Sequence, residues 1–312
     1  MRITNRVMNN NLLLNLNRGL TRLDRLNNQL ASKKQINVPS DDPVKAGTIL
    51  RTSTSIREVD QYTRNIDSAE SWLDASDVVM KDVLAVIHRA KELGVYGASS
   101  HLDGTARQAL ADEVKELHGN VLQLANSMHG GRYLFAGQYT QTKPFAEDQE
   151  HDGPGLPGIE FLPGLKDGDG NPIHPDENDM SIEFEIGTGV KMGVNMNGQE
   201  LFMPIFEALQ NLHGELIATT PSSSSGVLDD LDNALDNVLQ QVSELGGKQN
   251  RVGLAKERML DLKLNLTKIL SEDQDLDYAE AIMELKMEEF AYRTALSVGA
   301  RIIQPTLVDF LR

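Results

Sequence analysis

The 312-residue chain contains no cysteine, which excludes disulfide bonds, thiol nucleophiles and metal sites built on thiolates. Aromatic residues make up only 5% of it, so the buried surface must be largely aliphatic, as in seams between helices. The longest apolar run near the N-terminus, Leu12–Leu14, is far shorter than a signal-peptide core or the roughly 20 residues that cross a bilayer. We therefore expect no membrane span, no membrane partner and no cleaved signal peptide.

Positive charge is also scarce, because 30 Lys and Arg stand against 46 Asp and Glu, a formal net charge of −16. Such a chain cannot neutralise the phosphates of a long polyanion, so we expect no nucleic-acid partner. Residues 1–40 depart from this balance, since Asp24 is the single acid among seven basic side chains. The sequence thus has a basic head and an acidic body.

Glycine and proline divide the chain. Residues 146–200 hold 10 of the 25 Gly and 5 of the 11 Pro, which excludes a continuous helix there, and 219–226 form a Ser-rich flexible joint. We expect a mainly α fold with an inserted β part: an elongated, discontinuous helical bundle or coiled coil with a small β-rich outer domain. The expected domains are terminal helices at 1–42 and 276–312, a long-helix core at 43–145 and 196–275 with a hairpin near 131–145, and an acidic outer domain at 146–195.

Three long apolar series predict the core helices, because their members recur at alternating spacings of three and four. Asp42 and Pro43 are a suitable cap and first-turn residue for the first of these helices, and Gly130-Gly131 are expected to end the second. The series are Val59, Tyr62, Ile66, Ala69, Leu73, Ser76, Met80, Val83, Ile87 and Ala90; Leu110, Val114, Leu117, Val121, Leu124 and Met128; and Leu231, Leu235, Val238, Val242, Leu245, Val252, Met259 and Leu266, with Gln249, Lys256 and Lys263 at intervening seam positions.

A β-hairpin is predicted late in the outer region. Apolar residues alternate in 182–186 and again in 190–196, and Gly187-Thr188-Gly189 separates the two runs. This pattern predicts one buried face, with the hairpin as a structural insertion between helices.

The two ends of the chain carry thin apolar stripes at helical spacing, too narrow to fold alone. We expect both ends to be disordered in the monomer and to become an ordered helix pair only in an assembly, where copies of the chain cover the remaining apolar surface. The expected assembly-interface residues are Leu13, Leu16, Leu20, Leu23 and Leu30 in the head, and Ile282, Leu285, Tyr292, Leu296, Ile303 and Phe310 near the C-terminus.

Several segments resemble the flagellin superfamily, and they occur in the family's order. They are Met1–Thr4; Gln29–Val44, with Ser40, Asp41, Asp42 and Pro43; Gly131–Gly137 followed by Lys143-Pro144-Phe145; Gln249, Asn250 and Arg251; Asp275–Ala281; and Leu307–Leu311. The Pro-Ser-Asp-Asp-Pro form at 39–43 resembles the hook-associated, junction-type members more than filament flagellins. One departure is Ala31–Gln35, which replaces the family's commoner form with small residues and Gly, so the turn before Ile36 is expected to differ.

This resemblance implies a structural protein of the bacterial flagellum with no enzymatic activity. It implies terminal helices that pair as an inner coiled-coil layer, an unfolded passage through the flagellar export apparatus with an export chaperone, and an extracellular location at the hook-filament junction. The implied partners are further copies in a ring or helical layer, hook-associated protein 1 on one side and flagellin on the other, in an adaptor that filament assembly and motility require. Filament flagellin is the alternative within the family.

An alternative of another class is a secreted, calcium-dependent binding module that presents 146–195. Asp167, Asp169 and Asn171 resemble the start of an EF-hand loop, but Pro172 and Asn178 stand where Gly and a bidentate Glu belong. Gly153, Gly155 and Gly158 fit a phosphate-binding pattern only formally, since prolines interrupt it. No His pair or Ser elbow suggests catalysis, so we expect no cofactor and no metal.

Overall fold

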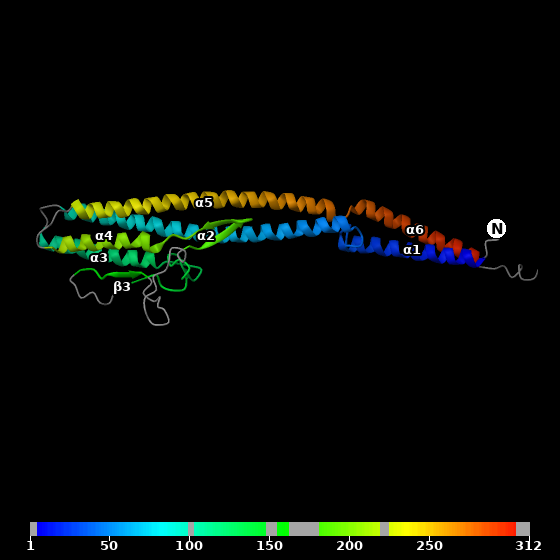
Figure 1. The fold of residues 1–312 in the computed structure, drawn as a ribbon, viewed down its shortest axis with the longest axis horizontal. Coiled ribbons are helices and arrows are strands. Elements are labelled where there is room, and N and C mark those ends of the chain that lie inside the picture. The colour runs from blue at the N-terminus through cyan, green and yellow to red at the C-terminus, as the bar shows by residue number, and fades with distance from the viewer. Residues whose placement is uncertain (1–4, 99–102, 148–154, 162–180, 219–224, 304–312) are drawn as a thin grey trace, which may run out of the picture. The chain divides into compact units, whose positions relative to one another are not determined.

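The computed structural model describes residues 5–98, 103–147, 155–161, 181–218 and 225–303, which are mostly helical with short antiparallel strand pairs (Figure 1). The predicted fold class, mainly α with an inserted β part, is confirmed. The chain forms two compact units: unit 1 comprises 1–60 and 261–312, and unit 2 comprises 61–260. Their limits fall inside two long helices, α2 (Pro43–Gly97) and α5 (Ser225–Gln274), whereas the expected domain limits fall at breaks between helices.

Helix α2 begins where its sequence predicts. The Asp42 carboxylate accepts hydrogen bonds from the backbone N–H groups of Val44 and Lys45 at 2.9 and 3.0 Å, and Pro43 occupies the first helical position. The predicted stripe is confirmed, because every member from Val59 to Ala90 is buried except Tyr62, which is half-buried. The regular spacing therefore located the buried face of a 55-residue helix.

Helices α2 and α5 run antiparallel, and a ladder of polar pairs fixes their register. Its members are spaced by seven residues on both helices, so each pair falls two turns from the next on the same face. The pairs are Lys263–Asp60 at 2.8 Å, Lys256–Asp67 at 3.0 Å and Gln249–Asp74 at 3.1 Å. Lys256 also bonds Glu70 at 2.6 Å, and these two carboxylates raise its pKa. The three polar residues at the seam positions of the third series thus all have acidic partners on α2.

The second predicted helix differs from expectation at its end and in its face. Helix α3 (Gly104–Ala125) stops before Gly130-Gly131, because the Asn126 side chain donates to Leu122 O and Phe145 O and accepts from Phe145 N. The buried face includes His118 and lies one residue C-terminal to several predicted positions. Its buried members are Ala111, Val114, His118, Val121 and Ala125, whereas Leu110, Leu117 and Leu124 are half-buried and Met128 is exposed.

Three strand pairs lie in the described part of unit 2. Strands β1 (Met128–His129) and β2 (Arg132–Tyr133) enclose Gly130 and Gly131, whose positive φ values of 57° and 78° suit a tight hairpin turn. The predicted late hairpin is confirmed as β5 (Glu183–Gly187) and β6 (Val190–Gly193), with Phe184 opposite Met192. Strand β3 (Phe145–Glu147) pairs with β4 (Ile159–Phe161).

Helix α4 (Gly198–Ile217) packs on α3 and closes an aromatic cluster. The ring of Phe145 lies 5.5 Å from Phe202 and 5.8 Å from Phe206, measured between centroids, and Phe135 lies 4.9 Å from Phe202. The β pairs thereby attach to the helices through a few large side chains. Among the described helices, none combines the length and apolarity that crossing a membrane requires.

Replacing Gly198 by Ala should destabilise unit 2 by about 1–3 kcal/mol, because overpacking forces the backbone to move. A Cβ at Gly198 would lie 2.4 Å from Phe135 O and 2.9 Å from Phe135 Cβ. The matched control is Gly119→Ala in α3, where no atom lies within 4 Å, and it should stabilise by up to about 1 kcal/mol. Urea unfolding measures both changes, and a Gly198→Ala variant as stable as the parent would refute the close approach.

Acid should weaken the α3–α4 contact. Burial lowers the pKa of His118 to about 4, with a smaller effect from His213, and burial also lowers the pKa of His213. The pKa of His118 in the folded chain lies below its unfolded value of 6.5. The free energy of unfolding that its neutral ring contributes is therefore complete above pH 6.5 and is lost as the pH falls toward 4. The loss amounts to at most about 3 kcal/mol at pH 4.

Urea unfolding of the parent and of His118→Leu between pH 7 and 4 measures this contribution. Other groups titrate in both chains, so the difference between the two free energies of unfolding isolates His118. We expect the parent to lose more stability than the variant as the pH falls from 6.5. Parallel curves for the two chains would refute the assignment.

Candidate functional site

The terminal helices α1 (Asn5–Ser32) and α6 (Tyr278–Ile303) form an antiparallel pair within unit 1. A glycine allows close approach at Gly299, where a Cβ would lie only 2.6 Å from Leu12 Cδ2, whereas a Cβ on Gly19 would make an ordinary contact of 3.5 Å with Tyr292 Cδ2. Arg22 Nε donates to Glu288 Oε1 at 2.7 Å, and this exposed bond raises the pKa of Arg22. Apolar contact and one ion pair therefore hold the helices in register.

The structure divides the predicted interface residues into two groups. Leu16, Leu23, Leu30, Leu285 and Tyr292 are half-buried, whereas Leu13, Leu20, Ile282 and Leu296 remain exposed. The side chain of Ile303 and the whole of Phe310 lie outside the described residues. The prediction did not include Leu26, Gln29 and Ala281, three side chains of these helices that are buried.

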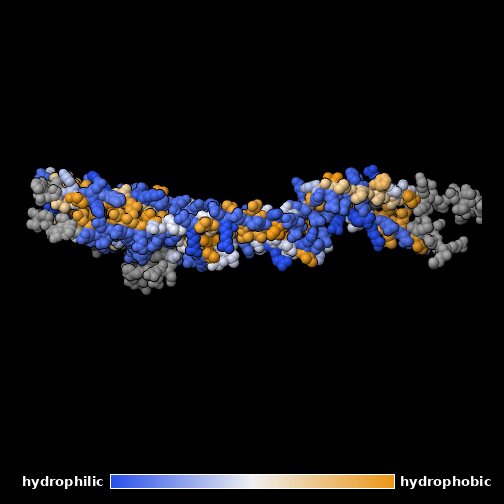
Figure 2. Space-filling model, turned by 90° about the horizontal axis from the view of Figure 1, so that it is seen from above, coloured by the Kyte–Doolittle hydropathy of each residue, from blue (hydrophilic) through white to orange (hydrophobic). Residues whose placement is uncertain are grey.

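A second apolar face on α6 also escaped the sequence analysis. At 100° per residue, Met283, Met287, Phe290 and Val298 fall on one side of the helix, opposite Tyr292 and the other residues that face α1. Their exposed fractions are 61%, 64%, 73% and 48%. We call these four residues the outer α6 stripe. Figure 2 shows hydrophobic surface over the stretch that α1 and α6 occupy.

An open groove of about 680 Å³ adjoins this stripe between α1 and α6. Its lining combines arginines from α1 with glutamates from α6, and Met287 belongs both to the groove and to the outer α6 stripe. The charged members are Arg22, Arg25, Glu280, Glu284 and Glu288, together with Asp275 and Asp277. Unit 1 thus offers an apolar strip beside a depression with charges of both signs.

The breaks before α2 and before α6 are tied together by the backbone. Lys34 forms a bridge with Asp275, Gln35 N donates to Gln274 O at 2.8 Å, and Leu276 N donates to Lys33 O at 3.3 Å. Lys33 has a φ of +64°, a left-handed conformation that glycine adopts more easily. The unusual residues at 31–35 therefore do not prevent the turn; a lysine takes it instead.

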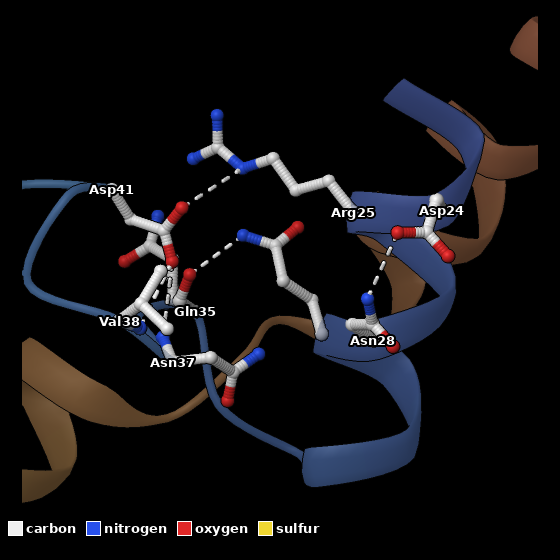
Figure 3. A network of polar contacts seen from close by, with 8 residues as sticks. Asp24, Arg25, Asn28, Gln35, Asn37, Val38 and Asp41 are labelled. Carbon is white, nitrogen blue, oxygen red and sulfur yellow. Dashed lines mark hydrogen bonds and ion pairs between the residues drawn. The ribbon is translucent and has the colours of Figure 1, made fainter. Parts of the chain in front are cut away.

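The family-motif aspartates organise this connection, and Figure 3 shows Asp41 among its partners. Asp41 Oδ2 accepts from the backbone N–H groups of Asn37 and Val38 at 3.2 Å each, and its other oxygen lies 3.9 Å from Arg25 Nε. Asp42 caps α2, and Asp277 caps α6 by accepting from Ala279 N at 2.9 Å. These aspartates stabilise the turns of the chain by accepting hydrogen bonds from backbone N–H groups. Ser40 and Pro43 are exposed beside them.

The second family motif lies on α5. Gln249 belongs to the polar ladder through Asp74, whereas Asn250 and Arg251 are exposed. This motif therefore lies at the surface of α5, and we assign it no catalytic or binding role. In the parts of the chain that the structure describes, no three His, Asp or Glu side chains gather as metal ligands. Asp167, Asp169, Asn171, Pro172 and Asn178, the residues of the calcium alternative, lie outside those parts.

Two family models match the sequence. The bacterial flagellin N-terminal helical region matches residues 3–140, and the bacterial flagellin C-terminal helical region matches residues 228–311. Together they take in both helical ends and more than half of the chain. Residues 141–227, which include strands β3–β6 and helix α4, fall outside both matches.

Individual relatives and structures agree with these models. Flagellar hook-associated protein 3 of Escherichia coli is 26% identical over 275 residues, which cover 86% of each chain. Polar flagellin F of Vibrio parahaemolyticus is 23% identical over 342 residues, covering 88% of this chain and 89% of the relative. A crystal structure of the flagellar junction protein from Legionella pneumophila has a TM-score of 0.56 at 15% identity and covers 72% of this chain and 100% of that one. At that identity the likeness supports the fold alone.

Proposed function

Because the chain belongs to the bacterial flagellin family, whose members are structural proteins of the flagellum rather than enzymes, we propose that it is the adaptor at the hook-filament junction. In this role it joins hook-associated protein 1 on the hook side to flagellin on the filament side. It forms a ring or helical layer of identical subunits, and filament growth and motility depend on it.

The outer α6 stripe is the observation that carries the self-association. Helix α6 is apolar toward α1 and also on its opposite side, and a helix with two apolar faces requires two packing partners. Helix α1 supplies one partner, and a neighbouring copy supplies the other. Closed or helical layers of identical subunits arise when one surface of a copy contacts a different surface of the next.

Two observations favour the junction over the filament itself. The Pro39–Pro43 segment resembles the junction-type members, and in this structure it is the turn that Asp41 and Asp42 hold. The relative named flagellar hook-associated protein 3 supports the same position. Filament flagellins also match, so the position requires a direct test.

Export and order at the chain ends belong to the same proposal. The chain leaves the cell unfolded through the flagellar export apparatus, with a chaperone. In the free chain α1 and α6 have low local stability, because a single pair of exposed helices buries little apolar surface. Assembly stabilises them by covering the outer α6 stripe.

Deletion of the gene in its own bacterium tests the position. A junction adaptor predicts cells that keep hooks, lack filaments, do not swim and release unpolymerised flagellin into the medium. A filament protein predicts hooks with no major flagellin released. Electron microscopy of the deletion strain and immunoblotting of its medium distinguish these outcomes, and normal filaments in the deletion strain would contradict both.

A further inference from the structure

The methionines of this chain are unequally exposed. Without cysteine, they are its only sulfur centres. Met80, Met192, Met196 and Met259 are at most 8% exposed, and Met203 is half-buried. The three other methionines whose side chains the structure describes are open to solvent: Met283 at 61%, Met287 at 64% and Met128 at 53%.

Two of the exposed methionines occupy the same face. Met283 and Met287 are four residues apart on α6, so they are neighbours along the outer α6 stripe, next to Phe290. Met128 lies in β1, in the other unit. Among the methionine side chains that the structure describes, solvent therefore reaches a thioether pair within the surface that we assign to self-association, and one thioether elsewhere.

We propose that Met283 and Met287 form an oxidation site at which hydrogen peroxide switches off self-association of the free chain. This inference rests on the function proposed above. A lone pair of the thioether sulfur attacks one peroxide oxygen, the O–O bond breaks, and the sulfur gains a bond to oxygen while water leaves. The sulfur is oxidised by two electrons to a sulfoxide and the peroxide is reduced.

The sulfoxide changes the interface and leaves the subunit intact. Its oxygen is a strong hydrogen-bond acceptor, and a contact that buries the outer α6 stripe would leave this acceptor without a donor. Within the subunit Met283 does not line the groove between α1 and α6, Met287 lines only its open surface, and both side chains are more than half exposed, so oxidation costs little packing between α1 and α6. Once assembled, the pair is covered, and the polymer resists the reaction that inactivates the free chain.

The test treats the full-length monomer with dilute hydrogen peroxide, removes the oxidant and locates sulfoxides by peptide mass spectrometry. We expect Met283, Met287 and Met128 to be oxidised well before Met80 and Met259. Sedimentation should then show that the concentration required for self-association rises by about tenfold or more. The helix signal and thermal unfolding should be unchanged. Reduction by a methionine sulfoxide reductase with a dithiol should restore assembly.

Two pairs of variants locate the effect. Met283→Leu with Met287→Leu should assemble normally and resist peroxide, and Met283→Gln with Met287→Gln should assemble poorly without it. Met128→Leu and Met128→Gln are the matched controls and should behave as the parent does. Unimpaired assembly of chains oxidised at both positions, or slow oxidation of the pair, would overturn the inference alone. Untreated chains that never associate would overturn the proposed function and the inference with it.

Discussion

Replacement of Phe290 by Asp should abolish assembly while leaving the folded subunit unchanged. Phe290 is the most exposed member of the outer α6 stripe, at 73%, so the free chain loses no packing with it. In a polymer the new carboxylate would be buried without a partner, at a cost of about 3 kcal/mol or more per contact. That cost raises the concentration needed for association by about a hundredfold or more.

Sedimentation of the purified chain measures association, and swimming of a complemented deletion strain measures function. Phe290→Leu is the matched control, because it keeps an apolar side chain in the same place, and it should retain both properties. Circular dichroism should be identical for the parent and both variants. A Phe290→Asp chain that assembles and restores swimming would exclude the outer α6 stripe from the interface.

Replacement of Phe145 by Ala should produce the largest loss of folding stability, about 3–5 kcal/mol. Phe145 is fully buried, and its ring contacts Phe161, Phe202 and Phe206 at centroid distances of 5.1, 5.5 and 5.8 Å. No other side chain joins strand β3 to helix α4 through so many described ring contacts. Removing it leaves a cavity between the strands and the helix.

Urea unfolding, monitored by a spectroscopic signal from unit 2, measures this loss of stability. Phe145→Leu is the control and should cost roughly half as much or less, because it keeps most of the buried volume. Phe290→Ala provides a second comparison, since it removes the same side chain from an exposed site and should change stability by less than about 0.5 kcal/mol. A loss for Phe145→Ala as small as that for Phe290→Ala would contradict the packing described here.

The sequence was most informative where a residue pattern reflected a single structural element, such as one helix face or one hairpin. Helix α2 meets α5 at several positions in unit 2, from Asp67 to Lys91, so its buried face repeats regularly and the series from Val59 to Ala90 was located correctly. The hairpin at 183–193 was equally clear, because strand alternation and the Gly-Thr-Gly turn coincide. The polar positions Gln249, Lys256 and Lys263 were visible as a pattern, but their acidic partners are set by the register of α2 and only the structure identifies them.

The sequence was misleading where contacts between distant side chains determine where a helix ends and which of its faces is buried. Gly130-Gly131 looked like a helix end, but Asn126 ends α3 earlier by bonding to Phe145, 19 residues away, and the glycines serve the next turn. The buried face of α3 shifts because His118, a polar residue in sequence terms, is buried as a neutral ring against Phe206. Neither effect follows from periodicity, since both depend on tertiary partners.

The candidate site was half predicted for a related reason. The predicted residues Leu285 and Tyr292 lie on the side of α6 that meets α1, but one apolar stripe per helix leaves out the opposite side. Met283, Met287 and Phe290 repeat at the same helical spacing on the other side, so the signal was available as a second apolar series. A second face is expected only of a helix with partners on two sides, which one folded chain does not supply.

Hydrogen-deuterium exchange tests the central claim most directly: the terminal helices of a free chain gain their stability from neighbouring copies. In dilute monomer, amides of α1 and α6 should exchange far faster than those of α2 between Ile66 and Ala90. In the assembled state, the same amides of α1 and α6 should become slow. If both terminal helices exchange as slowly as α2 in the monomer, or if assembly leaves their rates unchanged, the claim is wrong.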